Sequence, residues 1–198
     1  MLCATPPSAA PSEATALIAK LARPVPASTA YTEVRFVHLL RKPLVLQGQL
    51  DYNGPGQLGK RVEAPYRETT TIAAGAVEVT RAERPPKRFD LDRAPELKAL
   101  LTGFSALLGG DAATLQQFYT MEFVENAPNW TLTLLPRAAD SGSHLRALVV
   151  AGAGVEPRCF TLQQADGDSS TMLLGALSEA TLPQPPTPAA VAALCARP

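Results

Sequence analysis

The chain has 198 residues, of which 46% are hydrophobic and 18% are charged, and its 18 basic residues are balanced by 18 acidic ones. This size and composition predict one globular domain with a full hydrophobic core. The zero net charge and the lack of a basic run argue against nucleic acid or an anionic membrane surface as a partner. No apolar run is long enough to span a membrane, so we expect a soluble protein.

Both ends of the chain are rich in Ala and Pro. We expect a single domain over residues 1–198 with flexible ends at 1–11 and 183–198, because such compositions rarely pack and are common in the tails of exported proteins. The first residues lack the charged and apolar regions of a signal peptide. We therefore expect a mature, exported form that begins with an added methionine.

The three cysteines, Cys3, Cys159 and Cys195, have neither CxxC spacing nor a neighbouring His. This argues against a zinc site or a thioredoxin-like centre. In an exported protein two of the three would form a disulfide, but the spacing does not say which two, and three unrelated thiols are the alternative. We expect no metal and no cofactor.

The first part of the chain passes from a helical to a strand pattern. Apolar residues at helical spacing predict a short helix over residues 12–22, ended by Pro24 and packed across one mouth of a sheet. From Tyr31 onward apolar and polar residues alternate. This alternation predicts about five antiparallel strands, at residues 31–40, 44–52, 57–63, 66–73 and 76–82.

Residues 89–120 carry the only long helical signal. One apolar stripe at offsets of three and four is formed by Leu97, Leu100, Leu101, Phe104, Leu107 and Leu108. Pro95 suits the first turn, Gly109 and Gly110 end the helix, and Asp111 can cap a second, shorter one. We predict the longest helix inside residues 93–109. It either completes a core or covers a cleft as a movable lid.

Alternation resumes after the helices and predicts about five more strands, at residues 119–123, 130–134, 145–151, 155–164 and 169–174. Two blocks of adjacent antiparallel strands, interrupted once by helices, indicate a mainly β (α+β) fold. We expect one large curved sheet whose concave side the helices cover.

Few residues form a recognisable catalytic pattern. His38 and His144 are the only histidines, and neither is accompanied by a nucleophile elbow, a phosphate loop or a metal motif. Asp166-Gly167-Asp168 resembles the start of a calcium loop, but the later ligands are missing, which favours a hairpin turn. We therefore expect a protein that is not an enzyme.

The chain has more apolar surface than a small core requires. A sheet curved enough to be half a barrel leaves a cleft, and apolar residues that line such a cleft form a small-molecule or lipid site. An ordinary filled core is the alternative. The candidate residues for the cleft and its lid are Phe36, Leu44, Leu46, Tyr52, Leu97, Leu101, Phe104, Leu108, Met121, Phe123, Trp130 and Leu132.

The order of these elements resembles the LolA family of periplasmic outer-membrane lipoprotein carriers. The resemblance covers residues 12–175, and it rests on the helices and on the segments 43–52, 55–56, 68–72 and 130–136. It is closest to the divergent LolA-like branch encoded with pigment or aryl-polyene lipid biosynthesis in some Gram-negative bacteria. The resemblance implies an incomplete antiparallel β-barrel (half-barrel) of about 10–11 strands, covered by an α-helical lid.

The resemblance also implies a function. The protein would bind acyl chains of lipoproteins or a lipid product in the apolar cleft, without catalysis, and move them through the periplasm towards the outer membrane. Its partners would be a lipid or an acylated lipoprotein, an inner-membrane transporter and an outer-membrane acceptor, and we expect a monomer. Two other readings stay open: a periplasmic interaction module with a filled half-barrel, and a small lipid or thioester hydrolase that uses His38 or His144.

One position departs from the family pattern. Carriers of this family place an Arg before the proline of the turn after the second strand, where it holds the lid closed, but here Gly54 precedes Pro55. The resemblance therefore implies a lid that opens more readily, with Lys60 or Arg61 as substitute donors.

Overall fold

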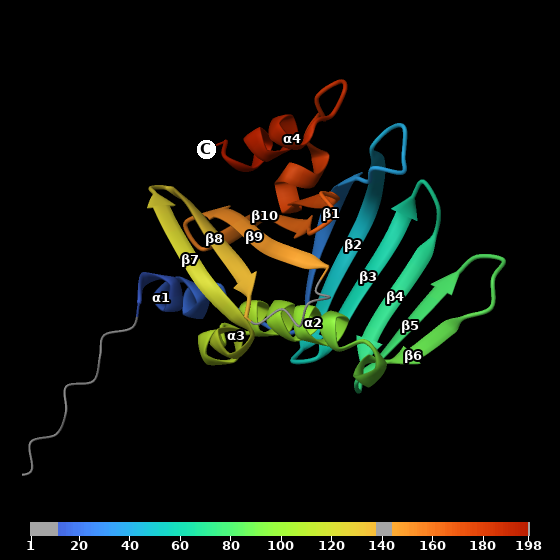
Figure 1. Cartoon of the computed structure of the whole chain (residues 1–198), viewed down its shortest axis with the longest axis horizontal. Coiled ribbons are helices and arrows are strands. Elements are labelled where there is room, and N and C mark those ends of the chain that lie inside the picture. The colour runs from blue at the N-terminus through green and yellow to red at the C-terminus, as the bar shows by residue number, and fades with distance from the viewer. Residues whose placement is uncertain (1–11, 138–143, 198) are drawn as a thin grey trace, which may run out of the picture.

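The computed structural model describes residues 12–137 and 144–197. Within them the chain forms one antiparallel sheet of eleven strands (Figure 1). The strands are β1 (Ala27–Phe36), β2 (Leu44–Gly54), β3 (Gln57–Ala64), β4 (Glu68–Ala73), β5 (Ala76–Arg81), β6 (Lys87–Asp90), β7 (Tyr119–Asn126), β8 (Asn129–Pro136), β9 (Leu145–Ala153), β10 (Glu156–Gln164) and β11 (Ser169–Leu174).

The helices of the described residues lie before, between and after the strands. They are α1 (Glu13–Lys20), α2 (Pro95–Leu108), α3 (Ala112–Phe118) and α4 (Pro188–Cys195), with 3-10 helices at Leu91–Arg93 and Gly175–Glu179. None of these described helices combines the length and the hydropathy that a membrane span requires. The longest is α2, which confirms the prediction of the longest helix inside residues 93–109.

The strand order is β6-β5-β4-β3-β2-β1-β11-β10-β9-β8-β7. The first strand therefore pairs with the last, with Tyr31 opposite Leu174 and Phe36 opposite Ser169. The edge strands β6 and β7 are not bonded to each other, so the sheet stays open. The predicted open antiparallel sheet of about 10–11 strands with helices is confirmed.

Local sequence explains where the helices begin. Ser12 and Asp111 cap α1 and α3, and their side chains accept hydrogen bonds from the backbone N–H of Thr15 and Thr114. Pro95 stands at the start of α2, where no intrahelical partner exists for a backbone N–H. These signals depend only on neighbouring residues, so the starts of these helices can be predicted from the sequence.

The concave face of the sheet carries the main core. Figure 1 shows α2 running across this side from the region of β7 and β8 to that of β5 and β6. Buried strand residues on this face include Tyr31, Leu46, Trp130, Leu132 and Leu148, and they pack with Leu107 of α2 and Leu115 of α3.

The opposite face is covered by α4. Val191 and Leu194 of this helix are buried against Val34 and Leu173 of the sheet. The expectation of a flexible end at residues 183–198 is therefore wrong for α4, because its few apolar residues pack on an apolar patch that lies far away in the sequence. The other expected flexible end, residues 1–11, lies outside the described residues.

Two further predictions need correction. The strand β6 was missed because all four of its residues are exposed and show no apolar alternation. The strand β1 starts at Ala27 and ends at Phe36, so His38 lies in the turn that follows it rather than in the strand.

A disulfide joins Cys159 of β10 to Cys195 of α4. It selects one of the pairings that the sequence left open, while Cys3 lies outside the described residues. The bond fixes the C-terminal helix to the middle of the sheet, on the face opposite α2.

Replacing Cys159 and Cys195 together by Ala is expected to lower the free energy of unfolding by about 3–4 kcal/mol. The bond joins residues 36 positions apart, and it restricts the unfolded chain by closing a loop of that size. Urea unfolding followed by circular dichroism measures the effect. Reductant should move the wild type towards the variant and leave the variant unchanged, and equal midpoints without reductant would contradict the prediction.

Candidate functional site

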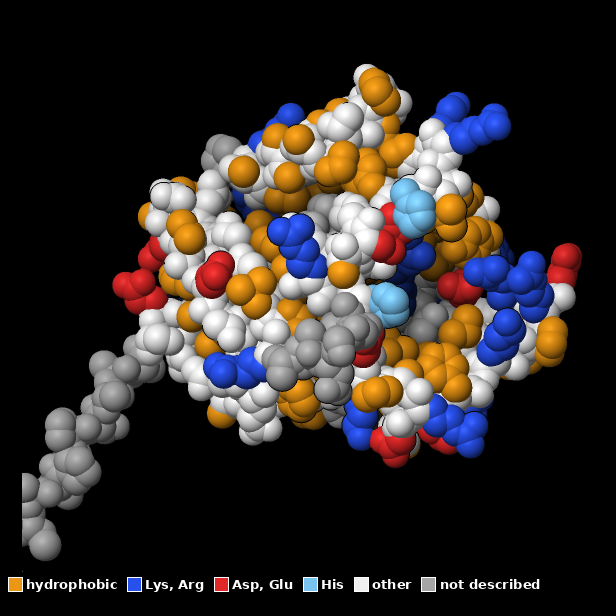
Figure 2. All heavy atoms as spheres, viewed as in Figure 1, with side chains coloured by type: hydrophobic (Ala, Val, Ile, Leu, Met, Phe, Trp, Pro, Cys, Tyr) orange, Lys and Arg blue, Asp and Glu red, His pale blue; other side chains and the backbone are white. Residues whose placement is uncertain are grey.

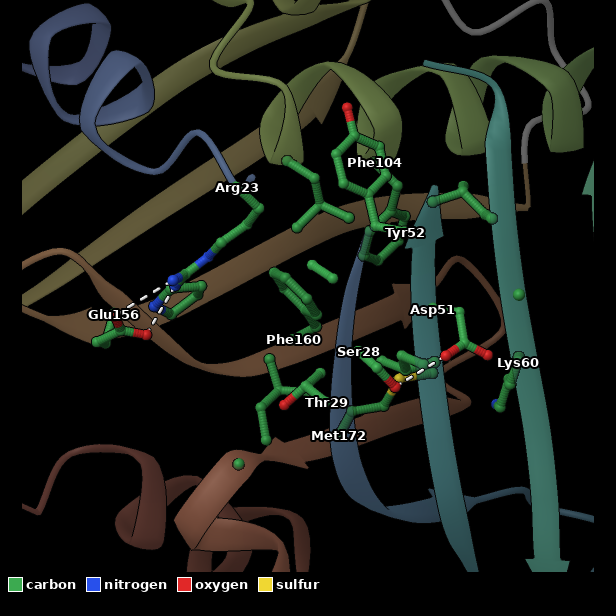
Figure 3. A pocket seen from close by; sticks show the side chains of 18 of the residues that line it. Arg23, Ser28, Thr29, Asp51, Tyr52, Lys60, Phe104, Glu156, Phe160 and Met172 are labelled. Carbon is green, nitrogen blue, oxygen red and sulfur yellow. Dashed lines mark hydrogen bonds and ion pairs between the residues drawn. The ribbon is translucent and has the colours of Figure 1, made fainter. Parts of the chain in front are cut away.

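A cleft with a volume of about 1120 Å³ lies between α2 and the concave face of the sheet. Most of its large apolar side chains come from three directions: the strands β2 to β4, the strands β10 and β11, and the lid helix α2. These residues are Leu50, Tyr52, Leu58 and Ile72; Phe160, Met172 and Leu174; and Leu101, Phe104 and Leu108. Figure 3 shows the side chains of Tyr52, Phe104, Phe160 and Met172 around one space.

An aromatic pair connects the lid to the sheet inside the cleft. The ring centroids of Phe104 and Phe160 are 5.0 Å apart and the rings meet edge to face at 86°. Such pairs contribute about 0.5–1.5 kcal/mol beyond the burial of their surface. The contact is apolar and adds to the packing of α2 on the sheet.

Few hydrogen bonds hold α2 in place. The backbone N–H of Gly56, in the turn after β2, donates to Ser105 Oγ at 2.8 Å, and the backbone N–H of Arg23 donates to the carbonyl of Leu108 at 2.8 Å. The Tyr119 hydroxyl donates a longer bond of 3.4 Å to the carbonyl of Ala99. All three are bonds between uncharged groups, and a fourth, exposed bond runs from the backbone N–H of His144 to the carboxylate of Glu96 at 3.4 Å.

Polar side chains border one opening of the cleft. Arg23 pairs with Glu156 at 2.7 Å, and Ser28 donates to Asp51 at 2.8 Å. Both pairs appear in Figure 3, where Arg23 and Glu156 lie on one side and Lys60 on the other. The cleft thus has an apolar middle and a polar border.

A charged cluster lies on the concave face beside the apolar lining. Glu33 of β1 is buried, and its carboxylate accepts bonds from Arg35 Nε at 2.7 Å, from Ser170 Oγ at 2.8 Å and from Lys60 Nζ. Lys60 also lines the cleft. We call these four residues the Glu33 cluster.

The cluster changes the acidity of its members. Burial alone would raise the pKa of Glu33, but the hydrogen bond from Arg35 and then the charge of Lys60 outweigh it, so the pKa of Glu33 lies below its usual value. Burial is the largest influence on Lys60 and lowers the pKa of its ammonium group, although Glu33 opposes this. Glu33 therefore compensates the charge of Lys60 only in part.

A family model described as outer membrane lipoprotein carrier protein LolA-like matches residues 4–197. The chain belongs to the LolA-like family. Members of this family are carrier and binding proteins rather than enzymes, and they are periplasmic or extracellular. Among curated proteins, none matches the chain.

Two solved structures are similar to this LolA-like chain. A LolA superfamily protein from Nitrosomonas europaea, NE2245, has a TM-score of 0.47 and 11% identity, and the match covers 89% of this chain and 96% of that one. LprF from Mycobacterium bovis has a TM-score of 0.34 and 11% identity, and the match covers 88% and 98% of the two chains.

The LolA-like cleft contains some of the residues that the sequence suggested. Tyr52, Leu101, Phe104 and Leu108 line it. Packed in the core beside it are Leu44, Leu46, Met121, Phe123, Trp130 and Leu132. Leu97 packs in a separate cluster between α2 and the strands β4 and β5. A role in ligand binding stays a prediction for all of them.

Phe36 is a correction, because it packs on the opposite face of the sheet, beside Val34 and under α4. Sequence reasoning also missed several lining residues, including Leu50, Phe160 and Met172, and the Glu33 cluster. Leu50 could have been predicted from the sequence, because it lies on the same face of its strand as Tyr52. The pairing of Glu33 with Lys60 could not, because these residues are 27 positions apart and each resembles a solvent-facing residue.

The position of the missing arginine is open space. Gly54 has φ +126°, and a Cβ built there would meet no atom within 4 Å. Neither suggested substitute donor reaches the lid, because Lys60 bonds to Glu33 and Arg61 to Asp51, the latter at 3.3 Å. Greater mobility of the LolA-like lid stays a prediction.

The histidines lie apart from the cleft lining. His38 Nδ1 pairs with Asp168 Oδ1 at 2.8 Å, but its side chain is 60% exposed and it does not line the cleft. Asp166 accepts a bond from the backbone N–H of Asp168 at 3.0 Å, as in a hairpin turn. The backbone N–H of His144 donates to Glu96 at 3.4 Å. The hydrolase reading therefore gains no support from either histidine.

Replacing Glu33 by Gln is expected to lower the free energy of unfolding at pH 7 by about 3 kcal/mol. This is the low end of the cost of breaking a buried ion pair, because the freed Arg35 reaches solvent. Folding lowers the pKa of Glu33. Its contribution to stability is therefore fully present above the pKa of the unfolded chain, about 4.3, and is lost as the pH falls through the pKa of the folded state. The difference between wild type and variant should therefore shrink below pH 4.3. Urea unfolding from pH 7 to 3 measures it, and a constant difference would contradict it.

Replacing Gly103 by Val is expected to loosen the lid and to lower stability by about 1–3 kcal/mol. A Cβ at Gly103 would lie 2.6 Å from the ring of Tyr119, which is buried and has little room to move. Intrinsic helix propensity favours Val by only a few tenths of a kcal/mol, so the clash should dominate. Amide hydrogen exchange across α2 and thermal unfolding measure the two effects. Thr102→Val is the matched control on the same helix, and equal protection in both variants would count against the prediction.

Proposed function

We propose that this protein binds acyl chains, of lipoproteins or of a free lipid product, in the cleft under α2 and carries them through the periplasm towards the outer membrane. The observation that supports this best is the apolar cleft itself, about 1120 Å³ in volume and continuous from sheet to lid. That volume lies above the roughly 300–1,000 Å³ of typical small-molecule sites. Membership of the LolA-like family supports the same conclusion.

The lining suits a flexible hydrocarbon chain. It combines aliphatic side chains from four strands and α2 with the rings of Tyr52, Phe104 and Phe160. Each methylene group transferred from water into such surroundings contributes about 0.8 kcal/mol, so ten of them contribute roughly 8 kcal/mol before the cost of ordering the chain. Acyl chains are therefore a better match than a compact polar ligand.

The other readings have less support. A filled half-barrel would leave no cavity of this size beneath α2. A hydrolase would need His38 or His144 within the cleft, and neither lines it. The carrier proposal also includes an inner-membrane transporter that loads the chain and an outer-membrane acceptor that receives it, with the carrier acting as a monomer.

The direct test is to recover the protein from the periplasmic fraction of its own host and to analyse it by native mass spectrometry and lipid extraction. We expect a lipid or an acylated peptide to co-purify in stoichiometric amounts with the wild type. Recovery from the cytoplasm, or a protein that never carries an acylated molecule, would contradict the proposal.

Replacing Phe104 by Asp is expected to reduce binding of N-phenyl-1-naphthylamine, a neutral dye that fluoresces in apolar surroundings, by at least tenfold. An unpaired carboxylate in the apolar lining costs several kcal/mol or draws water into the cleft. Leu39→Asp is the control, because Leu39 is an exposed leucine outside the cleft. A folded Phe104→Asp protein with wild-type affinity for the dye would remove α2 from the binding site.

A further inference from the structure

The Glu33 cluster has one more positive than negative charge. Arg35 and Lys60 both bond to Glu33, and it is the only carboxylate in the described residues that forms an ion pair with either. The nearby pair of Arg81 and Glu68, with a bond of 2.9 Å, is neutral by itself. One cation therefore remains uncompensated beside the cleft.

The uncompensated charge is concentrated at Lys60. Arg35 forms two hydrogen bonds with Glu33, at 2.7 and 3.2 Å, and its side chain is 37% exposed, so water also solvates it. Lys60 is only 20% exposed and shares the same carboxylate. A partly buried ammonium with a shared counterion gains more from a second anion than an exposed lysine does.

A buried tyrosine whose hydroxyl has no partner among the described residues lies beside this ammonium. Tyr31 is 1% exposed, and its hydroxyl has no hydrogen-bond partner among the described residues. Lys60 Nζ lies 5.0 Å from the centre of the Tyr31 ring. A buried hydroxyl without a partner costs about 1–3 kcal/mol, and native structures keep few of them without a reason.

The cluster adjoins one end of the apolar lining. On β3, Leu58 and Lys60 line the cleft but the next residue on that face, Val62, does not. Met172, which also lines the cleft, lies directly opposite Glu33 in the sheet. Figure 2 shows basic side chains bordering the hollow between the two halves of the sheet. The apolar surface thus ends at Lys60, which lies over the ring of Tyr31.

We propose that this end of the cleft binds the anionic head group, a carboxylate or a phosphate, of a free amphiphile whose chain lies under α2. Lys60 Nζ and the Tyr31 hydroxyl donate to the anion, and Glu33 and Arg35 hold Lys60 in position. The proposal rests on the proposed function and narrows it, because an acyl chain attached to a lipoprotein has no anionic group at its end. The preferred cargo is then a free anionic lipid rather than an acylated protein.

The test is competition against N-phenyl-1-naphthylamine by three amphiphiles with the same chain: dodecanoate, dodecyl phosphate and dodecan-1-ol. We expect at least one of the two anions to displace the dye at a concentration about tenfold lower than the alcohol, the factor that one charge-assisted hydrogen bond provides. The two anionic arms distinguish a carboxylate from a phosphate. Lys60→Met should abolish the preference for the anion over the alcohol.

Matched variants separate binding from folding. Arg61 lies on the same strand, pairs with Asp51 and does not line the cleft. Arg61→Met should therefore keep the preference for the anion over the alcohol. Lys60→Arg should keep it as well. Tyr31→Phe removes only the unpartnered hydroxyl, so it should leave stability unchanged or higher while weakening anion binding about tenfold.

The outcomes distinguish the two proposals. If none of the three amphiphiles displaces the dye, the proposed carrier function is wrong and this inference with it. If all three displace it equally, the cleft binds chains but the head-group site is wrong. Should Lys60→Met fail to fold by circular dichroism, Tyr31→Phe decides, and an unchanged preference in that folded variant would overturn the inference.

Discussion

The pairing of the first strand with the last one fixes the position of the lid. Because β1 lies between β2 and β11, the two arms of the sheet extend outward to β6 and β7, which become its opposite edges. The segment that joins these edges, residues 91–118, must therefore cross the sheet, and α2 lies over the concave face (Figure 1). A helix that spans two walls of a curved sheet touches both but does not fill the space between them. The cleft follows from this connection.

The sequence predicts the parts of the fold that depend on neighbouring residues. Alternation revealed ten of the strands, and Pro95 and Gly109 bounded the longest helix. Two elements depend on distant partners instead. The exposed strand β6 exists because β5 pairs with it, and α4 exists because Val191 and Leu194 meet an apolar patch and a disulfide on the far side of the sheet. The strand β6 leaves no local pattern, and α4 leaves only its Thr187 cap and Pro188 at its start.

The site is less predictable than the fold for a related reason. Alternation divides a strand into two faces but does not say which face is concave. Both faces of β1 carry buried side chains, Tyr31 on one and Val34 on the other. The sequence therefore did not show which face is concave, and Phe36 was assigned to the wrong face. In an alternating strand pattern, a buried glutamate such as Glu33 cannot be distinguished from an exposed one. Only the sheet order brings it next to Lys60.

The apolar cleft and the charged cluster have different roles in binding. Burial of hydrocarbon is strong but has no direction, so it retains a chain without fixing its position along the cleft. A charge-assisted bond from Lys60 is weaker than the burial of several methylene groups, yet it acts at one point. Under the two proposals, the cleft supplies affinity and Lys60 supplies orientation. The lid is held by apolar packing, including the pair of Phe104 and Phe160, by bonds between uncharged groups and by one exposed bond from the backbone N–H of His144 to Glu96. An incoming chain can replace the apolar contacts with equivalent ones. Among the described residues no buried ion pair links the lid to the sheet, so under the carrier proposal release depends on the contacts of the cargo rather than on a latch in the protein.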